Sequence, residues 1–149
     1  MKHIIYTLTF LFIGTSMLGQ EHVNTKGGYA AEGFDVVSYF QDQPQKGNKK
    51  FKTDYNGTAY KFASQENLEA FKNAPEKYIP QYGGFCAYAI AQNGKKVSVN
   101  PETYTITNGK LYLFYNSWGV NTLEKWNEEG AAALQQKADK TWKDLTSTN

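Results

Sequence analysis

Two Asn-Gly pairs constrain the fold of this chain more than any other feature of its sequence. Asn56-Gly57 and Asn108-Gly109 each separate two short runs rich in aromatic and β-branched residues. Both residue types tolerate the positive φ angles that two-residue hairpin turns require. The sequence therefore predicts two antiparallel hairpins, which join residues 51–55 to 58–62 and residues 103–107 to 110–115.

Helical patterns lie between and after these hairpins. Ser64 is placed to cap a helix that ends at Pro75, and Leu68 and Phe71 fall on one face of it. A short helix is expected over residues 123–127, followed by a longer one after a glycine. The apolar face of this last helix consists of Leu134, Ala138, Trp142 and Leu145. We expect that face to pack on a sheet, in a small single-domain α+β fold of hairpins, short helices and a C-terminal amphipathic helix.

The start of the chain predicts export. Residues 4–18 form an apolar run after the basic Lys2, too short for a comfortable membrane span but typical of a signal-peptide core. We therefore interpret residues 1–20 as a signal peptide, residues 21–32 as a flexible segment, and residues 33–146 as the domain. An uncleaved N-terminal anchor is the alternative. With the signal peptide removed, no transmembrane segment is expected, which indicates a periplasmic or secreted protein.

The amino-acid composition excludes some classes of function. The formal net charge is +2, and all 16 basic residues are lysines. Arginine supplies the planar fork that grips phosphates and guanine edges, so we expect no nucleic-acid partner. The chain has a single cysteine and hence no internal disulfide, although exported proteins meet an oxidising environment. The fold must therefore rest on an apolar core, to which the aromatic residues, 15% of the chain, contribute large buried areas.

Four segments carry a resemblance to a known family. They are Gly33-Phe-Asp-Val-Val-Ser-Tyr-Phe40, Gly57-Thr-Ala-Tyr-Lys-Phe-Ala-Ser64, Pro75-Glu-Lys-Tyr78 and Pro80-Gln-Tyr-Gly-Gly-Phe-Cys-Ala87. Together they resemble the YHS-domain family, and the last is similar to its exported, single-domain branch. The resemblance implies a compact α+β unit related to small cysteine-rich modules that bind metals and occur in copper-transporting pumps and other metal-handling proteins.

The resemblance carries over to this chain only in part. The positions where the metal-binding relatives commonly have cysteines correspond here to Val37 or a neighbour, Ala63 and Asn67. Only Cys86 can supply a thiolate, so it is the candidate metal ligand and a copper ion the candidate cofactor. Copper(I) accepts few soft ligands, whereas a structural zinc site normally needs four. The alternative is that Cys86 packs as a small apolar residue.

The sequence gives no good evidence for an enzyme. A nucleophilic cysteine generally needs an adjacent base, and His22 is the only histidine after the signal peptide. The candidate ligand-binding residues are Tyr39 and Tyr82, which offer an apolar ring with a polar tip, and Asp35, which could instead cap a turn. A bend at residues 82–86 is expected to bring Tyr39 or Asp35 close to Cys86.

Two functions follow from these observations. The first is an exported, non-catalytic binding domain of the YHS type with a link to copper handling. The second is a module that binds a small molecule or a protein through an aromatic pocket and has no role in metal binding. The nature of the ligand-binding site in the folded chain distinguishes them.

Overall fold

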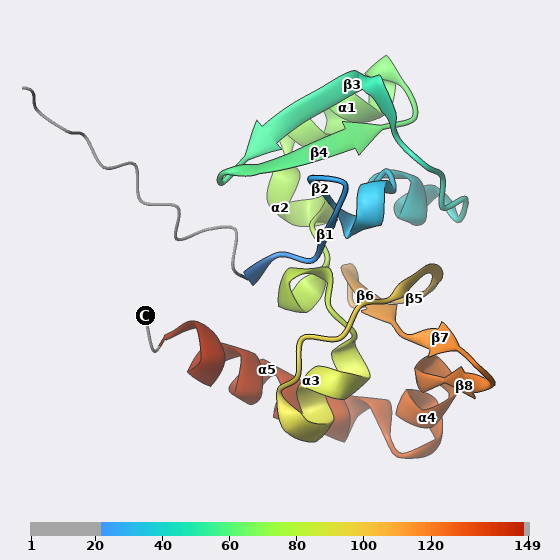
Figure 1. The fold of residues 1–149 in the computed structure, drawn as a ribbon, viewed down its shortest axis with the longest axis vertical. Helices are drawn as coiled ribbons and strands as arrows, with labels where there is room; N and C mark the ends of the chain where they lie inside the picture. The colour runs from blue at the N-terminus through green and yellow to red at the C-terminus, as the bar shows by residue number, and fades with distance from the viewer. Residues whose placement is uncertain (1–21, 148–149) are drawn as a thin grey trace, which may run out of the picture.

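Both Asn-Gly pairs form hairpin turns, as predicted (Figure 1). Asn56 and Gly57 have φ angles of 48° and 78°, and Asn108 and Gly109 have φ angles of 52° and 73°. The structure is a computed structural model that describes residues 22–147. The predicted signal peptide, residues 1–20, lies outside the described residues.

The strands form one four-stranded sheet and two separate hairpins. The larger sheet has the order β1-β2-β4-β3, in which only the β2–β4 pair is parallel. Its strands are β1 (Thr25–Lys26), β2 (Tyr29–Ala30), β3 (Asn48–Tyr55) and β4 (Thr58–Phe62). The hairpins are made of β5 (Asn100–Thr107) with β6 (Lys110–Phe114), and of β7 (Asn116–Ser117) with β8 (Val120–Asn121).

The helices begin and end where the sequence provides caps and breaks. The hydroxyl of Ser64 accepts a hydrogen bond from the Asn67 amide at 3.1 Å, as predicted for the start of the first helix. Pro75 ends that helix and begins the next, where its missing N–H is not needed. The helices are α1 (Gln65–Asn73), α2 (Pro75–Tyr78), α3 (Ala87–Asn93), α4 (Thr122–Glu128) and α5 (Ala131–Thr146). Short 3-10 helices are η2 (Ala31–Gly33), η3 (Ser38–Gln41) and η4 (Gln81–Gly84).

Two clusters of buried side chains form the core, and β6 belongs to both. Leu111 and Leu113 point into the first cluster, with the aromatic residues of β4 and α1. Tyr112 and Phe114 point into the second, with the apolar residues of α3, α4 and α5. Successive side chains of a strand alternate between its faces, so β6 is covered on both sides. This confirms the predicted α+β class, with hairpins packed against short helices.

The apolar face of α5 packs somewhat differently from our expectation. Leu134 and Ala138 are buried, but they pack against α3 as well as against Tyr112 and Phe114 of β6. Figure 1 shows α3 and α5 side by side in the lower part of the molecule. The β5–β6 hairpin is narrow, so a helix of 16 residues covers more than this sheet and meets the neighbouring helix.

The segment that precedes the first family-like motif is packed into the fold. We expected residues 21–32 to form a flexible segment ahead of the domain. In the structure β1 and β2 join the four-stranded sheet, and Ala30 and Ala31 are buried. Both side chains belong to the first core cluster. Within residues 22–147, no helix has the length and apolar character to cross a bilayer.

Candidate functional site

An aromatic cleft of about 790 Å³ lies where five parts of the chain meet. We call it the aromatic cleft. The β3–β4 hairpin supplies Tyr55 and Tyr60, η4 supplies Tyr82, and α5 supplies Trp142. The other two parts are the N-terminal segment, through His22, and α2, through Glu76. A volume in this range is typical of clefts that bind a small organic molecule, and such sites are usually lined by apolar and aromatic side chains.

Gly83 holds the N-terminal segment against this cleft. Its φ is +61°, and a Cβ added there would collide with the carbonyl oxygen of His22. The amide of Asn24 donates to the Gly83 carbonyl at 2.8 Å, and its side chain donates to the Gly84 carbonyl at 3.1 Å. The sequence predicted that this Gly-Gly pair permits a bend or a close approach. The structure uses it for both.

Two tyrosines of the cleft wall stay protonated and act as fixed polar groups. Burial and a hydrogen bond to Asp139 raise the pKa of Tyr82 well above its usual value. Its hydroxyl donates to Asp139 Oδ1 at 2.7 Å. Burial, with a smaller contribution from Tyr55, raises the pKa of Tyr60 to about 12. Both rings are therefore neutral at ordinary pH and present apolar surface to the cleft.

Asp35, by contrast, is a buried structural residue that directly precedes Val36 of the first core cluster. It is fully buried, and its carboxylate accepts four hydrogen bonds. The donors are the amides of Val37 (2.9 Å), Ser38 (3.3 Å) and Ala63 (2.8 Å) and the side-chain amide of Asn67 (2.7 Å). This carboxylate therefore ties η3 to the end of β4 and to α1, and does not line the aromatic cleft.

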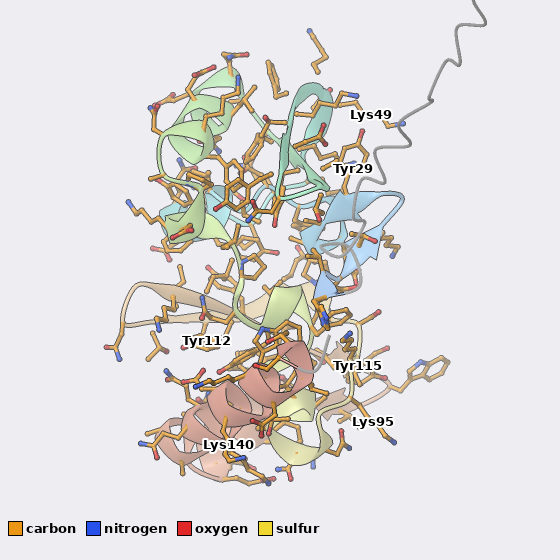
Figure 2. The ribbon with its side chains drawn as sticks, turned by 90° about the vertical axis from the view of Figure 1, so that its left-hand side faces the viewer. Tyr29, Lys49, Lys95, Tyr112, Tyr115 and Lys140 are labelled. Atoms are coloured by element: carbon orange, nitrogen blue, oxygen red, sulfur yellow. The ribbon has the colours of Figure 1, made fainter. Side chains whose placement is uncertain are left out.

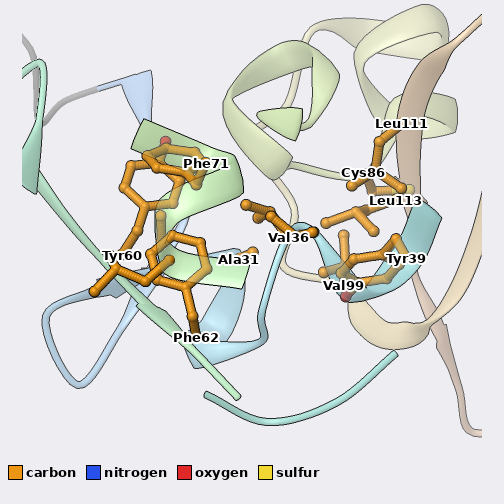
Figure 3. Close-up of a cluster of buried hydrophobic side chains, with 13 residues drawn as sticks. Ala31, Val36, Tyr39, Tyr60, Phe62, Phe71, Cys86, Val99, Leu111 and Leu113 are labelled. Carbon is orange, nitrogen blue, oxygen red and sulfur yellow. The ribbon is translucent and has the colours of Figure 1, made fainter. Parts of the chain in front are cut away.

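Tyr39 and Cys86 lie in the first core cluster, close to the β5–β6 hairpin (Figure 3). Tyr39 is fully buried, its hydroxyl donates to the Pro101 carbonyl at 2.6 Å, and burial raises its pKa well above the usual value. The Cys86 sulfur lies 3.3 Å from Thr122 Oγ1, which itself donates its only proton to the Tyr115 carbonyl. The thiol is consequently the donor to Thr122.

The structure thus does not bring the four residues that the sequence singled out together in one site. Tyr82 lines the aromatic cleft, whereas Asp35, Tyr39 and Cys86 do not. Tyr39 and Cys86 share a core cluster, but Tyr82 belongs to the other cluster. Tyr112 also belongs to that second cluster and lies between the β5–β6 hairpin and α5 (Figure 2).

Sequence reasoning missed most of the cleft wall. Tyr55 was expected in a hairpin and Trp142 on the apolar face of the last helix, Glu76 and Asp139 were not singled out as site residues, and nothing in the sequence grouped the four. They come from segments up to about ninety residues apart, and only the tertiary fold brings them together. The Gly-Gly pair beside Tyr82 was the one local signal that pointed to this region.

The four residues that donate to Asp35 lie in a part of the chain that resembles a known family, although Asp35 itself does not. Residues 37–82 match the YHS-domain family model. No curated protein and no solved structure matched the chain. The matched segment, called here the YHS segment, runs from just before η3 into η4. It therefore supplies Tyr55, Tyr60 and Tyr82 to the aromatic cleft, whereas Trp142 lies outside it.

In the YHS segment, residues other than cysteine occupy the positions where the resemblance implies cysteines. The backbone of Val37, the backbone of Ala63 and the side chain of Asn67 all donate to the Asp35 carboxylate. The three positions do converge in space, as a shared metal site would require. Here they surround the Asp35 carboxylate, which already accepts four hydrogen bonds. None of the three residues carries a thiol, so they offer no thiolates to copper or zinc.

The described residues do not fit a copper site at Cys86 either. Its side chain is fully buried beside Leu111 and Leu113 (Figure 3). Throughout residues 22–147, no three side chains of the histidine, cysteine, aspartate and glutamate types gather closely enough to hold a metal ion. A soft metal would need the thiolate, yet the thiol proton is held in the hydrogen bond to Thr122.

We expect the Cys86 thiol to be unreactive in the folded protein because no part of it reaches solvent. Ellman's reagent should label less than about a tenth of the thiol in native buffer within minutes and all of it in strong denaturant. Cys86→Ala should lower the free energy of unfolding by about 1 kcal/mol. The two proteins should take up copper(I) equally weakly against a competing chelator. Rapid native labelling, or copper binding that is lost in Cys86→Ala, would contradict this assignment.

Proposed function

We propose that this chain is an exported, non-catalytic binding domain that holds a small organic molecule in the aromatic cleft. The observation that carries the proposal is the cleft itself, with a volume of about 790 Å³ and a wall of tyrosine and tryptophan rings. The apolar start of the sequence supports export. The buried state of Cys86, the candidate nucleophile, supports a non-catalytic role.

The arrangement of the cleft wall favours a binding role over simple packing. The rings of Tyr82 and Trp142 lie 6.2 Å apart at an interplanar angle of 65°, and the Trp142 ring is only partly buried. Because these packed rings come from η4 and α5, a ligand that lies against the pair would contact both the YHS segment and the C-terminal helix. Aromatic side chains lose little conformational freedom on binding, so they provide contact area efficiently.

The proposal is tested with the neutral dye Nile red, whose emission rises in an apolar site. The full mature protein should enhance the emission at a one-to-one ratio. Trp142→Ala should weaken the dye's affinity by about tenfold or more, since a buried aromatic contact is commonly worth over 1.4 kcal/mol. Trp118→Ala is the matched control, because Trp118 is 94% exposed and does not line the cleft.

Two results would overturn the proposal. One is the absence of saturable dye binding to the folded protein. The other is equal loss of affinity in the two tryptophan variants, which would mean that the dye binds elsewhere or without specificity. Circular dichroism on both variants establishes that each is folded.

A further inference from the structure

The aromatic cleft carries two carboxylates that lack a lysine partner. Glu76 from α2 and Asp139 from α5 both line it. Among residues 22–147, neither forms an ion pair with a lysine; the ion pairs found there involve Glu32, Glu69 and Asp144. The α2 and α5 helices belong to the upper and lower parts of the molecule in Figure 1, so the charges come from two different walls.

Tyrosine hydroxyls hold both carboxylates at the aromatic wall. Tyr55 donates to Glu76 Oε1 at 3.3 Å, and Tyr82 donates to Asp139 Oδ1 at 2.7 Å. Each hydrogen bond satisfies one oxygen and keeps the negative charge beside a ring. The faces of tyrosine and tryptophan rings are themselves negative because of their quadrupole. Rings and carboxylates therefore favour the same sign of ligand charge.

The other charged or titratable groups of the cleft are few. Lys143 lies one helical turn after Asp139 and is exposed at the rim, and His22 packs edge-on against Trp142 at 5.9 Å. Counting Glu76, Asp139 and Lys143, the wall carries one more negative than positive charge. Lys143 opposes a positive ligand. Because Glu76, Asp139 and Lys143 are all exposed, solvent screens the attraction and the repulsion alike, and an excess of one negative charge remains.

We propose that the ligand of the aromatic cleft is an organic cation, of the alkylammonium class. This inference rests on the proposed function and adds the charge and chemistry of the ligand. A quaternary or alkylated ammonium group is attracted to the faces of aromatic rings and is weakly hydrated, so it enters an aromatic cleft readily. The two exposed carboxylates then supply an attraction that is greatest at low salt, without having to release lysine partners.

The test compares choline with 3,3-dimethylbutan-1-ol, its uncharged counterpart of nearly identical shape. Titration calorimetry on the full mature protein at low salt should give choline about a tenfold or greater advantage in affinity. That advantage should shrink as salt rises, because mobile ions screen the carboxylates. Nile red displacement by choline would locate the binding in the aromatic cleft.

Charge variants connect the preference to the two carboxylates. Glu76→Gln and Asp139→Asn should each reduce the affinity for choline several-fold and leave that for the alcohol unchanged; both amides can still accept the tyrosine hydrogen bond. Lys143→Gln should strengthen choline binding. Glu128→Gln is the matched control, since Glu128 is exposed on α4 and does not line the cleft.

The outcomes separate this inference from the proposed function. Equal affinity for choline and the alcohol, or a preference for choline that survives the Glu76→Gln/Asp139→Asn double variant, would overturn the cation inference. So would the absence of binding by either compound. In each of these cases, Nile red binding that depends on Trp142 would still support the proposed function. Its absence would overturn both.

Discussion

Replacing Asp35 by alanine should lower the free energy of unfolding by about 4 kcal/mol, because buried hydrogen-bond donors left without acceptors each cost about 1–3 kcal/mol. The carboxylate accepts from three backbone amides and one side-chain amide, and the residue is fully buried. The methyl group of alanine accepts nothing, and the cavity is too enclosed for ready hydration. Urea unfolding followed by circular dichroism measures the loss.

Two further variants define the origin of that loss. Asp35→Asn keeps one acceptor oxygen but directs an NH₂ group toward existing donors, so we expect an intermediate loss of about 2–3 kcal/mol. Asp42→Asn is the control, because Asp42 is exposed and has a φ of 56°, which asparagine tolerates. It should change stability by less than about 0.5 kcal/mol. A loss below about 1 kcal/mol in Asp35→Ala would contradict the structural role of the carboxylate.

Removing the Phe71 ring should destabilise the protein by about 3–5 kcal/mol, the usual range for a buried phenylalanine changed to alanine. Phe71 is 1% exposed, and its ring lies 4.9 Å from that of Tyr60 and 5.0 Å from that of Phe62. The cavity left behind would lie between α1 and the sheet. Thermal and urea unfolding give the change in stability.

The size of the loss should follow the volume removed. Phe71→Leu fills most of the site and should cost less than about 2 kcal/mol. Val120→Ala, at a partly exposed position with 41% of its surface accessible, should change stability by less than about 0.5 kcal/mol. If Phe71→Ala and Phe71→Leu were equally destabilising, ring volume would not be the cause.

The local parts of this fold could be predicted from the sequence. Asn56-Gly57 and Asn108-Gly109 form the predicted turns, and Ser64 caps α1. Each depends on a few adjacent residues whose backbone preferences are strong. The β7–β8 hairpin was missed because its turn contains Trp118, with a φ of 52°, and tryptophan is not a residue that signals a left-handed turn.

The candidate site could be predicted only at Tyr82. Its neighbours on the cleft wall, Tyr55 and Trp142, are joined to it by tertiary packing, which no spacing in the sequence encodes. Asp35 was ambiguous for a related reason. An aspartate within an apolar run fits a functional acid or a turn cap equally well, and only the donors from Ala63 and Asn67 identify it as a structural acceptor.

The side chains of β6 alternate between two core clusters, and this arrangement affects how the protein unfolds. A strand that is covered on both faces cannot leave one core without disturbing the other, so the two clusters should lose their order in a single cooperative transition. Amide hydrogens of Leu111 and Leu113 would then exchange with solvent only through global unfolding. For the same reason, the YHS segment is not a detachable module here, since β6, which lies outside it, closes its core.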